Sequence, residues 1–411
     1  MEVNITYTTG YAGTGKSTHL LNTLKGLNTD TAVVIAPTHK ALDRLRGHID
    51  DTQEIKTIHS LLGWIPTINE EAKHISHIES TYKLNKPLEA YTDIVIDEAG
   101  MMSEDMLFDI VGKLDILGYD ENGNIIDANL ANSTVNIHLY LDQYQLLPVK
   151  GIQIQVDDST TTRLTTQYRS TSLDVVALYT KFVDYLAGDA TSLHMPIQPS
   201  ELYSTNIRKF NTNEFKPGDR LLAYTNKAVG AWNKHLASKL GITSFIGQEV
   251  QLGNMLDTVI VDAWHTYSGV DEILADFKSE KLRLQNSNIS TRFLEASLHA
   301  LISHKNIQFI VAQGYVYPVI VGTAETKNIL NNAYAAAIKN KKMFKHVYTL
   351  GRAFSMDYTF ATTVHKSQGS EFENVFIDAH DIAKAIRNEY YDTYARLMYV
   401  GISRCINTLY I

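Results

Sequence analysis

Cysteine is nearly absent from this sequence, with Cys405 as the single example. One cysteine excludes an internal disulfide framework and a metal site built from several cysteines. No apolar run approaches the roughly 18 residues that a membrane span needs. The opening stretch, "MEVNITYTTG", lacks the basic and then apolar layout of a signal peptide. We therefore expect a cytoplasmic protein with no membrane partner.

Positive charge is also scarce relative to negative charge. The chain has 37 Lys and Arg against 45 Asp and Glu, a formal net charge of −8. The net charge therefore gives no sign of a nucleic-acid partner. It does not exclude one, because contacts to a nucleic-acid backbone need only a local groove of hydrogen-bond donors. With 411 residues, of which 44% are hydrophobic, the chain is long enough for at least two domains, since domains run about 100–200 residues.

The most specific pattern is a glycine-rich loop between an expected strand and an expected helix, in "VNITYTTGYAGTGKSTHLL". It fits G-x-x-x-x-G-K-[ST], in which glycines let backbone N–H groups converge on phosphate oxygens. The lysine of such a loop reaches the β- and γ-phosphates, and the following hydroxyl ligates Mg²⁺. A chance match is the alternative, and the strand-then-helix context argues against it. The expected nucleotide-binding residues here are Gly10, Ala12, Gly13, Thr14, Gly15, Lys16, Ser17 and Thr18.

Polar residues follow two further apolar strands. "TDIVI" ends in Asp97 and Glu98, where we expect Asp97 to hold Mg²⁺ through water and Glu98 to polarise the attacking water. A solvated turn or a helix N-cap is the alternative. "VNIHLYL" leads to Asp142, and the amide of Gln145 just beyond can sense the γ-phosphate. Strands alternating with helices predict a doubly wound parallel sheet with ligands at the strand carboxyl ends.

Two arginines follow periodic elements in a separate, second α/β unit of the chain. Arg169 lies in "TTQYRS", and Arg404 follows the expected helix "YARLMYVGIS". An arginine supplied across a domain cleft stabilises the charge that develops on a transferred phosphoryl group. A surface salt bridge is the alternative for either residue.

Eight segments resemble, in order, the motifs of a superfamily 1 DNA helicase. They are "GYAGTGKST", "APTHKAL", "TIHSLL", "DEAGMMS", "LDQYQLLPV", "TTQYRS", "TTVHKSQGSEF" and "RLMYVGISR". "TIHSLLGW", "AYTNKAV" and "HKSQG" most resemble the RecD/Dda-like branch. The resemblance implies an α/β fold with two RecA-like parallel-sheet P-loop domains, at residues 1–165 and 166–411. It also implies a β-hairpin insert in the first domain and a small, mostly β insert in the second.

The resemblance further assigns roles to residues of "TTVHKSQGSEF". Gln368 and Gly369 are expected near the nucleotide phosphates, and Glu371 is expected to accept from the ribose hydroxyl. Hydroxyl, imidazole and backbone N–H donors suit phosphates without a basic cluster. Taken singly, each histidine is more often an ordinary packed or surface residue. The expected DNA-backbone contacts are Pro37, Thr38, His39, Thr57, His59, Asn226, Thr363 and His365.

Two inserts bear on mechanism. Within residues 63–90 the resemblance implies a duplex-splitting hairpin near Ile65 to Ile78, with a surface loop as the alternative. Residues 251–352 form the second insert, which includes an expected helix at Thr291 to Ser303 and the strand-like "FIVAQGYVYPVIVG". Trp232 and Tyr317 either stack on bases or pack in the core, and their apolar-periodic contexts favour the core.

The resemblance implies an ATP-dependent DNA helicase that uses ATP and Mg²⁺, translocates on single-stranded DNA and unwinds duplex DNA. The branch alone suggests 5′→3′ polarity, and the preference for ATP is likewise inherited. Implied partners are single-stranded DNA, junctions with duplex, and a single-strand-binding or replication protein, for a monomer serving replication, recombination or repair. The main alternative is a DNA-stimulated ATPase that remodels protein–DNA complexes without unwinding. A metabolite kinase and a non-catalytic, ATP-switched clamp are more distant alternatives.

Overall fold

The computed structural model describes residues 2–69, 74–79, 88–115, 133–148, 151–168, 172–188, 202–252, 258–265, 307–312, 315–320, 354–386 and 391–411. The chain divides into two compact units. The first comprises Met1–Ile65, Ile78–Trp232 and Phe360–Ile411, and the second comprises Pro66–His77 and Asn233–Thr359. Within the described ranges, no helix is both long and apolar enough to cross a membrane.

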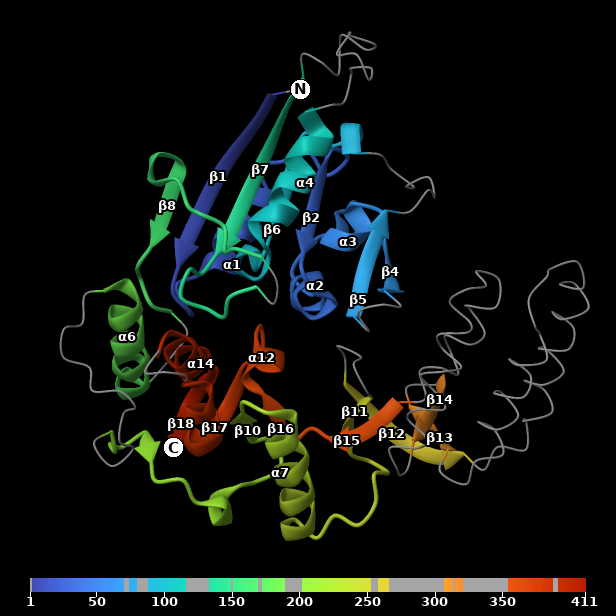
Figure 1. The fold of residues 1–411 in the computed structure, drawn as a ribbon, viewed down its shortest axis with the longest axis vertical. Helices are drawn as coiled ribbons and strands as arrows, with labels where there is room; N and C mark the ends of the chain where they lie inside the picture. Colours follow the sequence, from blue (N-terminus) through green and yellow to red (C-terminus); the bar gives the residue numbers. More distant parts are fainter. Residues whose placement is uncertain are drawn as a thin grey trace, which may run out of the picture. The chain divides into compact units, whose positions relative to one another are not determined.

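The first unit contains a six-stranded sheet in the order β3-β2-β6-β7-β1-β8 (Figure 1). All five neighbouring pairs are parallel. The strands are β1 (Glu2–Gly10), β2 (Ala32–Ala36), β3 (Glu54–Thr57), β6 (Asp93–Ile96), β7 (Thr134–Leu141) and β8 (Thr161–Leu164). Parallel strands that are covered on both faces are expected to be apolar throughout, as β2 is.

Helices cover both faces of this sheet, as successive residues of β2 demonstrate. Val33 and Ile35 pack in a core with α3 (Ile58–Leu61) and α4 (Glu104–Asp115). Val34 points the other way and packs with α1 (Lys16–Leu24) and with Leu45 of the helix α2 (His39–Arg46). Each fully buried aliphatic side chain contributes about 1.5–3 kcal/mol. This arrangement is the predicted doubly wound sheet.

A second parallel sheet of five strands, in the order β16-β10-β17-β18-β9, lies in the same unit. Its strands are β9 (Ile207–Arg208), β10 (Arg220–Ala223), β16 (Ala361–Thr363), β17 (Phe372–Ile377) and β18 (Cys405–Tyr410). Val375 and Ile377 share a core with α6 (Leu173–Ala187) and α14 (Asp392–Ile402). Between them, Phe376 packs instead on Phe215 and Tyr410. The remaining helices of this half are α7 (Asn226–Lys239), α12 (Val364–Ser367) and α13 (Ala379–Ile382).

Trp232 on α7 is a packing residue. Its Nε1 donates a hydrogen bond of 2.7 Å to Asp378 Oδ2, and its ring lies 5.5 Å from that of Phe210. Trp232 is half-buried, so it packs at the edge of this core, and its stacking on a base stays a prediction that these contacts do not test. The side chain of Tyr317 lies outside those described.

The second unit contains a closed barrel of five strands, β11-β12-β13-β14-β15. They are β11 (Glu249–Leu252), β12 (Thr258–His265), β13 (Ile307–Ala312), β14 (Tyr315–Ile320) and β15 (Phe354–Tyr358). The barrel core includes Val250, Val261, Ile310 and Val319. The predicted strand-like stretch forms the antiparallel pair β13 and β14. The helix expected at Thr291 to Ser303 lies outside the described residues.

A separate two-stranded sheet, β4 (Trp64–Asn69) with β5 (His74–Glu79), lies where the hairpin insert is predicted. The surface-loop alternative is therefore wrong. Short 3-10 helices occur at η1 (Leu88–Ala90), η2 (Ala99–Met101), η3 (Asp158–Thr160), η5 (Thr212–Glu214) and η6 (Ala383–Ala385).

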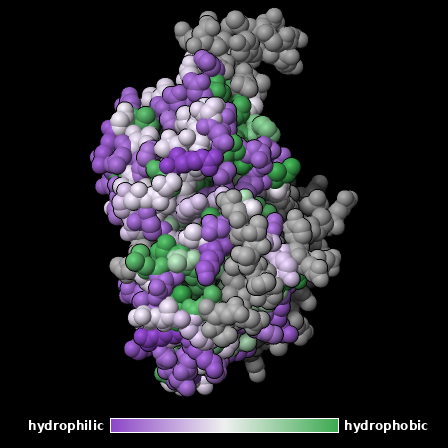
Figure 2. Space-filling model, turned by 90° about the vertical axis from the view of Figure 1, so that its left-hand side faces the viewer, coloured by the Kyte–Doolittle hydropathy of each residue, from purple (hydrophilic) through white to green (hydrophobic). Residues whose placement is uncertain are grey.

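Among the residues coloured in Figure 2, hydrophilic ones predominate and hydrophobic ones form small clusters. A few large apolar or aromatic side chains nonetheless reach solvent. Tyr168 is 73% exposed, and Leu173 is 80% exposed. Tyr168 bears on the site, because it lies beside the glycine-rich loop.

Candidate functional site

The loop between β1 and α1 has the backbone that phosphate binding needs. Gly13 and Gly15 have φ angles of 82° and 85°, in the left-handed region that favours glycine. Gly10 is required for a different reason: a Cβ there would lie 2.8 Å from the carbonyl oxygen of Leu164 on β8. Close packing at Gly10 and left-handed turns beyond it shape the loop at the carboxyl end of β1.

A cavity of about 300 Å³ opens at this loop and draws its lining from both sheets of the unit. Most of the predicted nucleotide-site residues therefore meet in one place. Gly10, Thr14 and Gly369 are not among the lining residues. Arg169 lies outside the described residues. The lining residues are Ala12, Gly13, Gly15, Lys16, Ser17, Thr18, Arg44, Asp97, Glu98, Gln145, Tyr168, Glu371 and Arg404.

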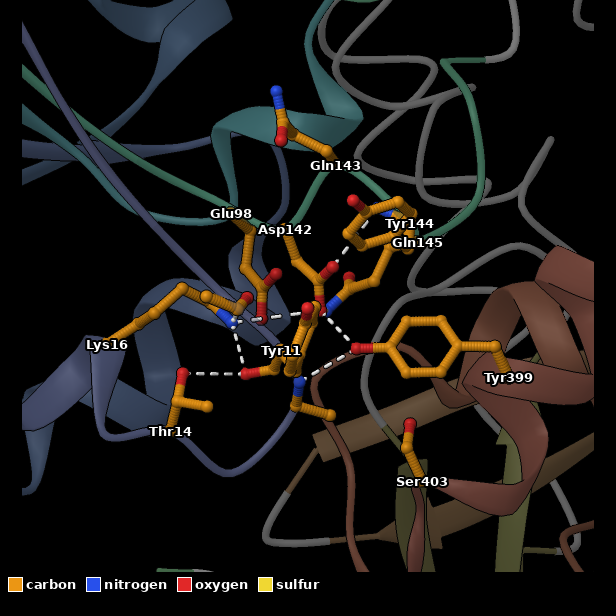
Figure 3. A network of polar contacts seen from close by, with 12 residues as sticks. Tyr11, Thr14, Lys16, Glu98, Asp142, Gln143, Tyr144, Gln145, Tyr399 and Ser403 are labelled. Carbon is orange, nitrogen blue, oxygen red and sulfur yellow. Dashed lines mark hydrogen bonds and ion pairs between the residues drawn. The ribbon is translucent and has the colours of Figure 1, made fainter. Parts of the chain in front are cut away.

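Lys16 turns back toward its own loop (Figure 3). Its Nζ donates to the carbonyl oxygens of Gly10 at 2.6 Å and Tyr11 at 2.8 Å, and lies 3.7 Å from Asp142 Oδ2. The ammonium group is thus anchored beside the backbone that would surround a phosphate.

Tyr399 joins the second sheet's helix α14 to this loop (Figure 3). Its hydroxyl donates to Asp142 Oδ2 at 2.5 Å and accepts from the backbone N–H of Ala12 at 2.8 Å. Burial, and secondarily Asp142, raises the pKa of Tyr399 well above its usual range, so the hydroxyl remains a donor. One turn earlier, Arg396 donates to the carbonyl oxygens of Gln143 and Gln145 at 2.7 Å each. These contacts connect the two sheets directly at the cavity.

Asp97 and Glu98 follow β6, as the sequence indicates. Burial, reinforced by Glu98, raises the pKa of Asp97, while Arg44 acts in the opposite direction. Glu98 has a φ of 50°, and it is the one non-glycine residue with a positive φ among the described residues. Such backbone strain is concentrated at functional sites. Arg44, which the sequence analysis did not identify, contacts Asp97 Oδ2 at 3.0 Å and Glu98 Oε1 at 3.4 Å.

Ser17 and Asp97 fit a magnesium ion carried by a nucleotide. Their oxygens flank a single point, because both accept from Nη2 of Arg44, at 3.2 and 3.0 Å. Mg²⁺ prefers oxygen ligands and is usually held by one or two protein groups together with substrate phosphates and water. Across the described ranges, no cluster of three or more His, Cys, Asp or Glu side chains would hold a metal alone. The Ser17 hydroxyl and the Asp97 carboxylate therefore suit a metal–nucleotide complex.

Arg404 reaches the cavity from a buried position with 2% exposure. Its Nε donates to the carbonyl oxygen of Val400 at 3.1 Å, and its Nη2 donates to Ser403 Oγ at 3.1 Å. Gln368, in the same half of the chain, donates to Gln145 Oε1 at 3.5 Å. The segment "HKSQG" is thus linked to the first sheet through this amide pair.

The threonines predicted to contact DNA share one structural role, since each caps a helix that follows a parallel strand. Thr38 accepts from the Ala41 N–H, Thr57 from Ser60 and Thr363 from Lys366, at 3.2 Å each. A cap uses a lone pair of the hydroxyl oxygen and leaves its hydrogen for donation. Three helix N-termini, which favour anions, thereby lie at carboxyl ends of strands β2, β3 and β16.

The remaining predicted DNA contacts lie in the same turns. Pro37 precedes the cap of α2, and Asn226 opens α7 after β10. His59 is half-buried in the first turn of α3, and the side chain of His39 lies outside those described. His365 reaches solvent, yet partial burial lowers its pKa because desolvation disfavours the imidazolium. A neutral His365 can donate one N–H to a phosphate but adds no charge.

The segment "TTQYRS" contributes contacts that the sequence analysis missed. The side-chain amide of Gln167 donates to the carbonyl oxygen of Ala12 at 2.8 Å, and the N–H of Tyr168 donates to Gly13 at 2.8 Å. The Tyr168 ring lies 3.4 Å from the point where a Cβ of Gly15 would be. An exposed aromatic ring at the cavity rim offers a face for a nucleobase.

Family comparisons match both ends of the chain. Residues 1–119 match the AAA domain family, and residues 358–411 match the UvrD-like helicase C-terminal domain family. No curated protein matches the sequence.

Solved structures of Pif1 helicases share the fold along nearly the whole chain. One is a Pif1 structure described as showing unwinding of forked double-stranded DNA by two coordinating helicases, with 17% identity and a TM-score of 0.52. The alignment covers 99% of this chain and 87% of that one. Bacteroides Pif1 bound to single-stranded DNA gives 16% identity and a TM-score of 0.51, covering 99% and 88%. Bacteroides Pif1 with ADP-AlF3 and single-stranded DNA has 16% sequence identity and a TM-score of 0.51. That alignment covers 100% of this chain and 88% of the Pif1 chain.

These likenesses confirm the predicted architecture of two RecA-like sheets with a hairpin insert and a β insert. At both ends of its sequence and in its fold, the chain resembles superfamily 1 helicases of the Pif1/RecD-like branch.

Proposed function

We propose that this chain is a DNA helicase that hydrolyses ATP at the cavity, translocates 5′→3′ on single-stranded DNA and unwinds duplex DNA. The observation that carries the proposal is the composition of the cavity, in which the phosphate loop and carboxylates of one sheet meet Glu371 and Arg404 of the other. A site lined by both sheets changes shape when they move, so it can convert hydrolysis into motion. The proposed domain boundaries remain residues 1–165 and 166–411.

In the proposed hydrolysis, each side chain has one task. The loop N–H groups and Lys16 bind the phosphates, and Ser17 and Asp97 hold the Mg²⁺ that neutralises phosphate charge. Glu98 orients the attacking water and accepts its proton. Arg404, from the second sheet, stabilises the charge that develops on the γ-phosphoryl group, and Gln145 senses that group.

Contacts between the sheets provide the proposed coupling to DNA. Tyr399 and Arg396 bind the segment 142–145, and Gln368 binds Gln145. The two sheets would close around ATP and reopen when the products leave. This motion would move the helix caps after β2 and β3 relative to the cap after β16. Alternating grip by these two sets on the DNA backbone yields directional steps. Opening each base pair costs about 1.4 kcal/mol of stacking on average.

The similar structures support this proposal, since they are described as Pif1 with single-stranded DNA, with forked DNA and with ADP-AlF3. We therefore propose single-stranded DNA and single-strand–duplex junctions as ligands. Glu371 is proposed to accept from the ribose and Tyr168 to stack on the base. A protein that binds single-stranded DNA or a replication protein is proposed as a further partner of the monomer.

Strand displacement tests the proposal and its main alternative together. Duplexes with either a 5′ or a 3′ single-stranded tail are incubated with ATP, and the released strand is measured alongside phosphate release. Displacement from the 5′-tailed duplex alone is expected. DNA-stimulated phosphate release without a displaced strand would support the remodelling ATPase instead. Displacement from the 3′-tailed duplex would show the opposite, 3′→5′ polarity.

Shortening the β4–β5 hairpin is expected to impair unwinding and spare hydrolysis, because no described residue of the hairpin lines the cavity. The variant replaces residues 67–76 with an Asn–Gly turn, which suits a tight two-residue connection. Strand displacement and DNA-stimulated phosphate release are measured on the same preparation. Equal loss of both activities would remove the hairpin from the unwinding step.

A further inference from the structure

Arg44 lies among the three groups that the proposed hydrolysis needs most. Its Nη2 donates to Ser17 Oγ at 3.2 Å, Asp97 Oδ2 at 3.0 Å and Glu98 Oε1 at 3.4 Å. Ser17 and Asp97 are the proposed metal-holding pair, and Glu98 is the proposed water-activating group. One guanidinium therefore contacts both the proposed metal-holding pair and the proposed water-activating group.

The ion pairs of Arg44 are strong, but the hydrogen-bonding capacity of its guanidinium group is not fully used. The side chains of Asp97 and Glu98 are 3% and 10% exposed, and that of Arg44 is 26% exposed. Buried like charges repel, and a cation between them relieves the repulsion. Among the described residues, however, Nε of Arg44 is buried without a hydrogen-bond partner. Arg44 therefore stabilises the two carboxylates, but its own Nε would gain a hydrogen bond if the side chain moved to another position.

Arg44 in this position and a metal–nucleotide complex exclude each other. Mg²⁺ requires its oxygen ligands at about 2.0–2.1 Å in near-octahedral geometry. A guanidinium nitrogen within hydrogen-bond distance of both Ser17 Oγ and Asp97 Oδ2 takes the place of an ion held by Ser17 and, through water, by Asp97, and it carries like charge. Glu98 Oε1 also contacts Arg44, and this neighbouring positive charge lowers the tendency of the carboxylate to take a proton from water. Hydrolysis therefore requires Arg44 to withdraw.

The helix that carries Arg44 begins at the proposed DNA contacts. Helix α2 runs from His39 to Arg46, and Thr38 is its cap. At about 1.5 Å per residue, Arg44 lies only about 9 Å along the axis from Thr38. Ala41, Leu42 and Leu45 fix the helix to its neighbours, and Arg44 extends from it into the cavity. A shift or rotation of this single short helix moves both ends together.

We propose that Arg44 is a positioning residue that holds the hydrolytic centre shut, and that binding of a DNA backbone at the start of α2 withdraws it. Withdrawal opens Ser17 and Asp97 to the metal–nucleotide complex and returns Glu98 to the attacking water. The inference rests on the proposed function and deepens it, because it gives the DNA-stimulated step a physical origin. The stimulus acts through the helix on which both sets of contacts lie.

The test uses Arg44→Gln, which removes the charge, and Arg44→Lys, which retains it. Arg46→Gln is the matched control, since Arg46 is an exposed arginine on the same helix. Thermal unfolding checks that each variant is folded. The first readout is the Mg²⁺ concentration that gives half-maximal binding of a fluorescent ADP analogue, measured with and without an oligothymidylate. The second is steady-state phosphate release under the same two conditions.

Without DNA, Arg44→Gln is expected to lower the Mg²⁺ midpoint by about tenfold and to raise basal hydrolysis by a similar factor, a typical size for coupling between sites. Arg44→Lys should fall between this variant and the unaltered chain, and Arg46→Gln should match the unaltered chain. With oligothymidylate, the midpoint of the unaltered chain should move to that of Arg44→Gln. Unchanged Mg²⁺ midpoints in Arg44→Gln would overturn the inference, and so would loss of DNA-saturated hydrolysis.

The proposed function fails in a different way. If oligothymidylate leaves phosphate release by the unaltered chain unchanged, the DNA-dependent activity is wrong, and the withdrawal of Arg44 by DNA is wrong with it. If the unaltered chain is stimulated while Arg44→Gln behaves like Arg46→Gln, only the inference about Arg44 is overturned.

Discussion

Lys16→Ala is expected to abolish ATP turnover, with a fall in kcat of at least about 10²–10³-fold, the usual effect of deleting one preorganised donor to developing charge. Lys16 Nζ donates to the carbonyl oxygens of Gly10 and Tyr11, so the ammonium group is already positioned at the phosphate loop before a ligand binds. No other lysine lines the described part of the cavity and could replace it. Steady-state phosphate release in the presence of single-stranded DNA measures the effect.

Lys25→Ala is the matched control for this experiment. Lys25 is the exposed residue that follows the end of the same helix, and its side chain donates a hydrogen bond of 3.2 Å to Asn22. It should leave turnover and thermal stability close to those of the unaltered chain. Persistent DNA-stimulated hydrolysis in Lys16→Ala would show that the nucleotide is processed elsewhere.

Arg404→Ala is expected to lower hydrolysis by about 10³-fold or more while nucleotide binding persists, as for an arginine that acts on the transferred phosphoryl group. Arg404 reaches the cavity from the second sheet, so its contribution depends on both sheets. Nucleotide binding is measured with a fluorescent ADP analogue, and hydrolysis is measured by phosphate release. Arg208→Ala, which removes an exposed ion pair with Glu214, is the matched control.

Because Arg404 is buried and donates to the carbonyl oxygen of Val400, its loss also removes structural hydrogen bonds. Arg404→Lys therefore serves as a second variant, since it keeps the charge but loses the planar fork of donors. Retained folding and binding with slow hydrolysis in Arg404→Lys supports the catalytic role. Full hydrolysis in a folded Arg404→Ala variant would make Arg404 a structural residue.

Local patterns predicted the architecture well because they depend on neighbours in sequence. The apolar run Ala32–Ala36 becomes a strand buried on both faces, and "VNIHLYL" becomes most of β7. The loop from Gly10 to Ser17 is equally local, since its left-handed turns require glycine at Gly13 and Gly15. The apolar, strand-like stretch "FIVAQGYVYPVIVG" likewise located the pair β13 and β14.

Contacts between distant residues could not be predicted in the same way. Arg44 and Asp97 are separated by 53 positions, and Ala12 and Tyr399 by 387, so no periodicity relates them. Arg44 occurs in "DRLR", which has the composition of an ordinary solvated helix face. Tyr399 and Arg396 are spaced to share one helix face, which groups them but does not identify Asp142 or Gln145 as partners. The partners of Tyr399 and Arg396 are set by how the two sheets pack together, and that of Arg44 by how α2 packs on the first sheet.

Steady-state ATP hydrolysis with and without single-stranded DNA, for the unaltered chain and Glu98→Gln, tests the central claim most directly. The account predicts strong stimulation by DNA in the unaltered chain. It predicts loss of turnover in Glu98→Gln, because an amide keeps the shape of the side chain but cannot accept the proton of the attacking water. Turnover that is indifferent to DNA would contradict the account and favour a nucleotide or metabolite kinase.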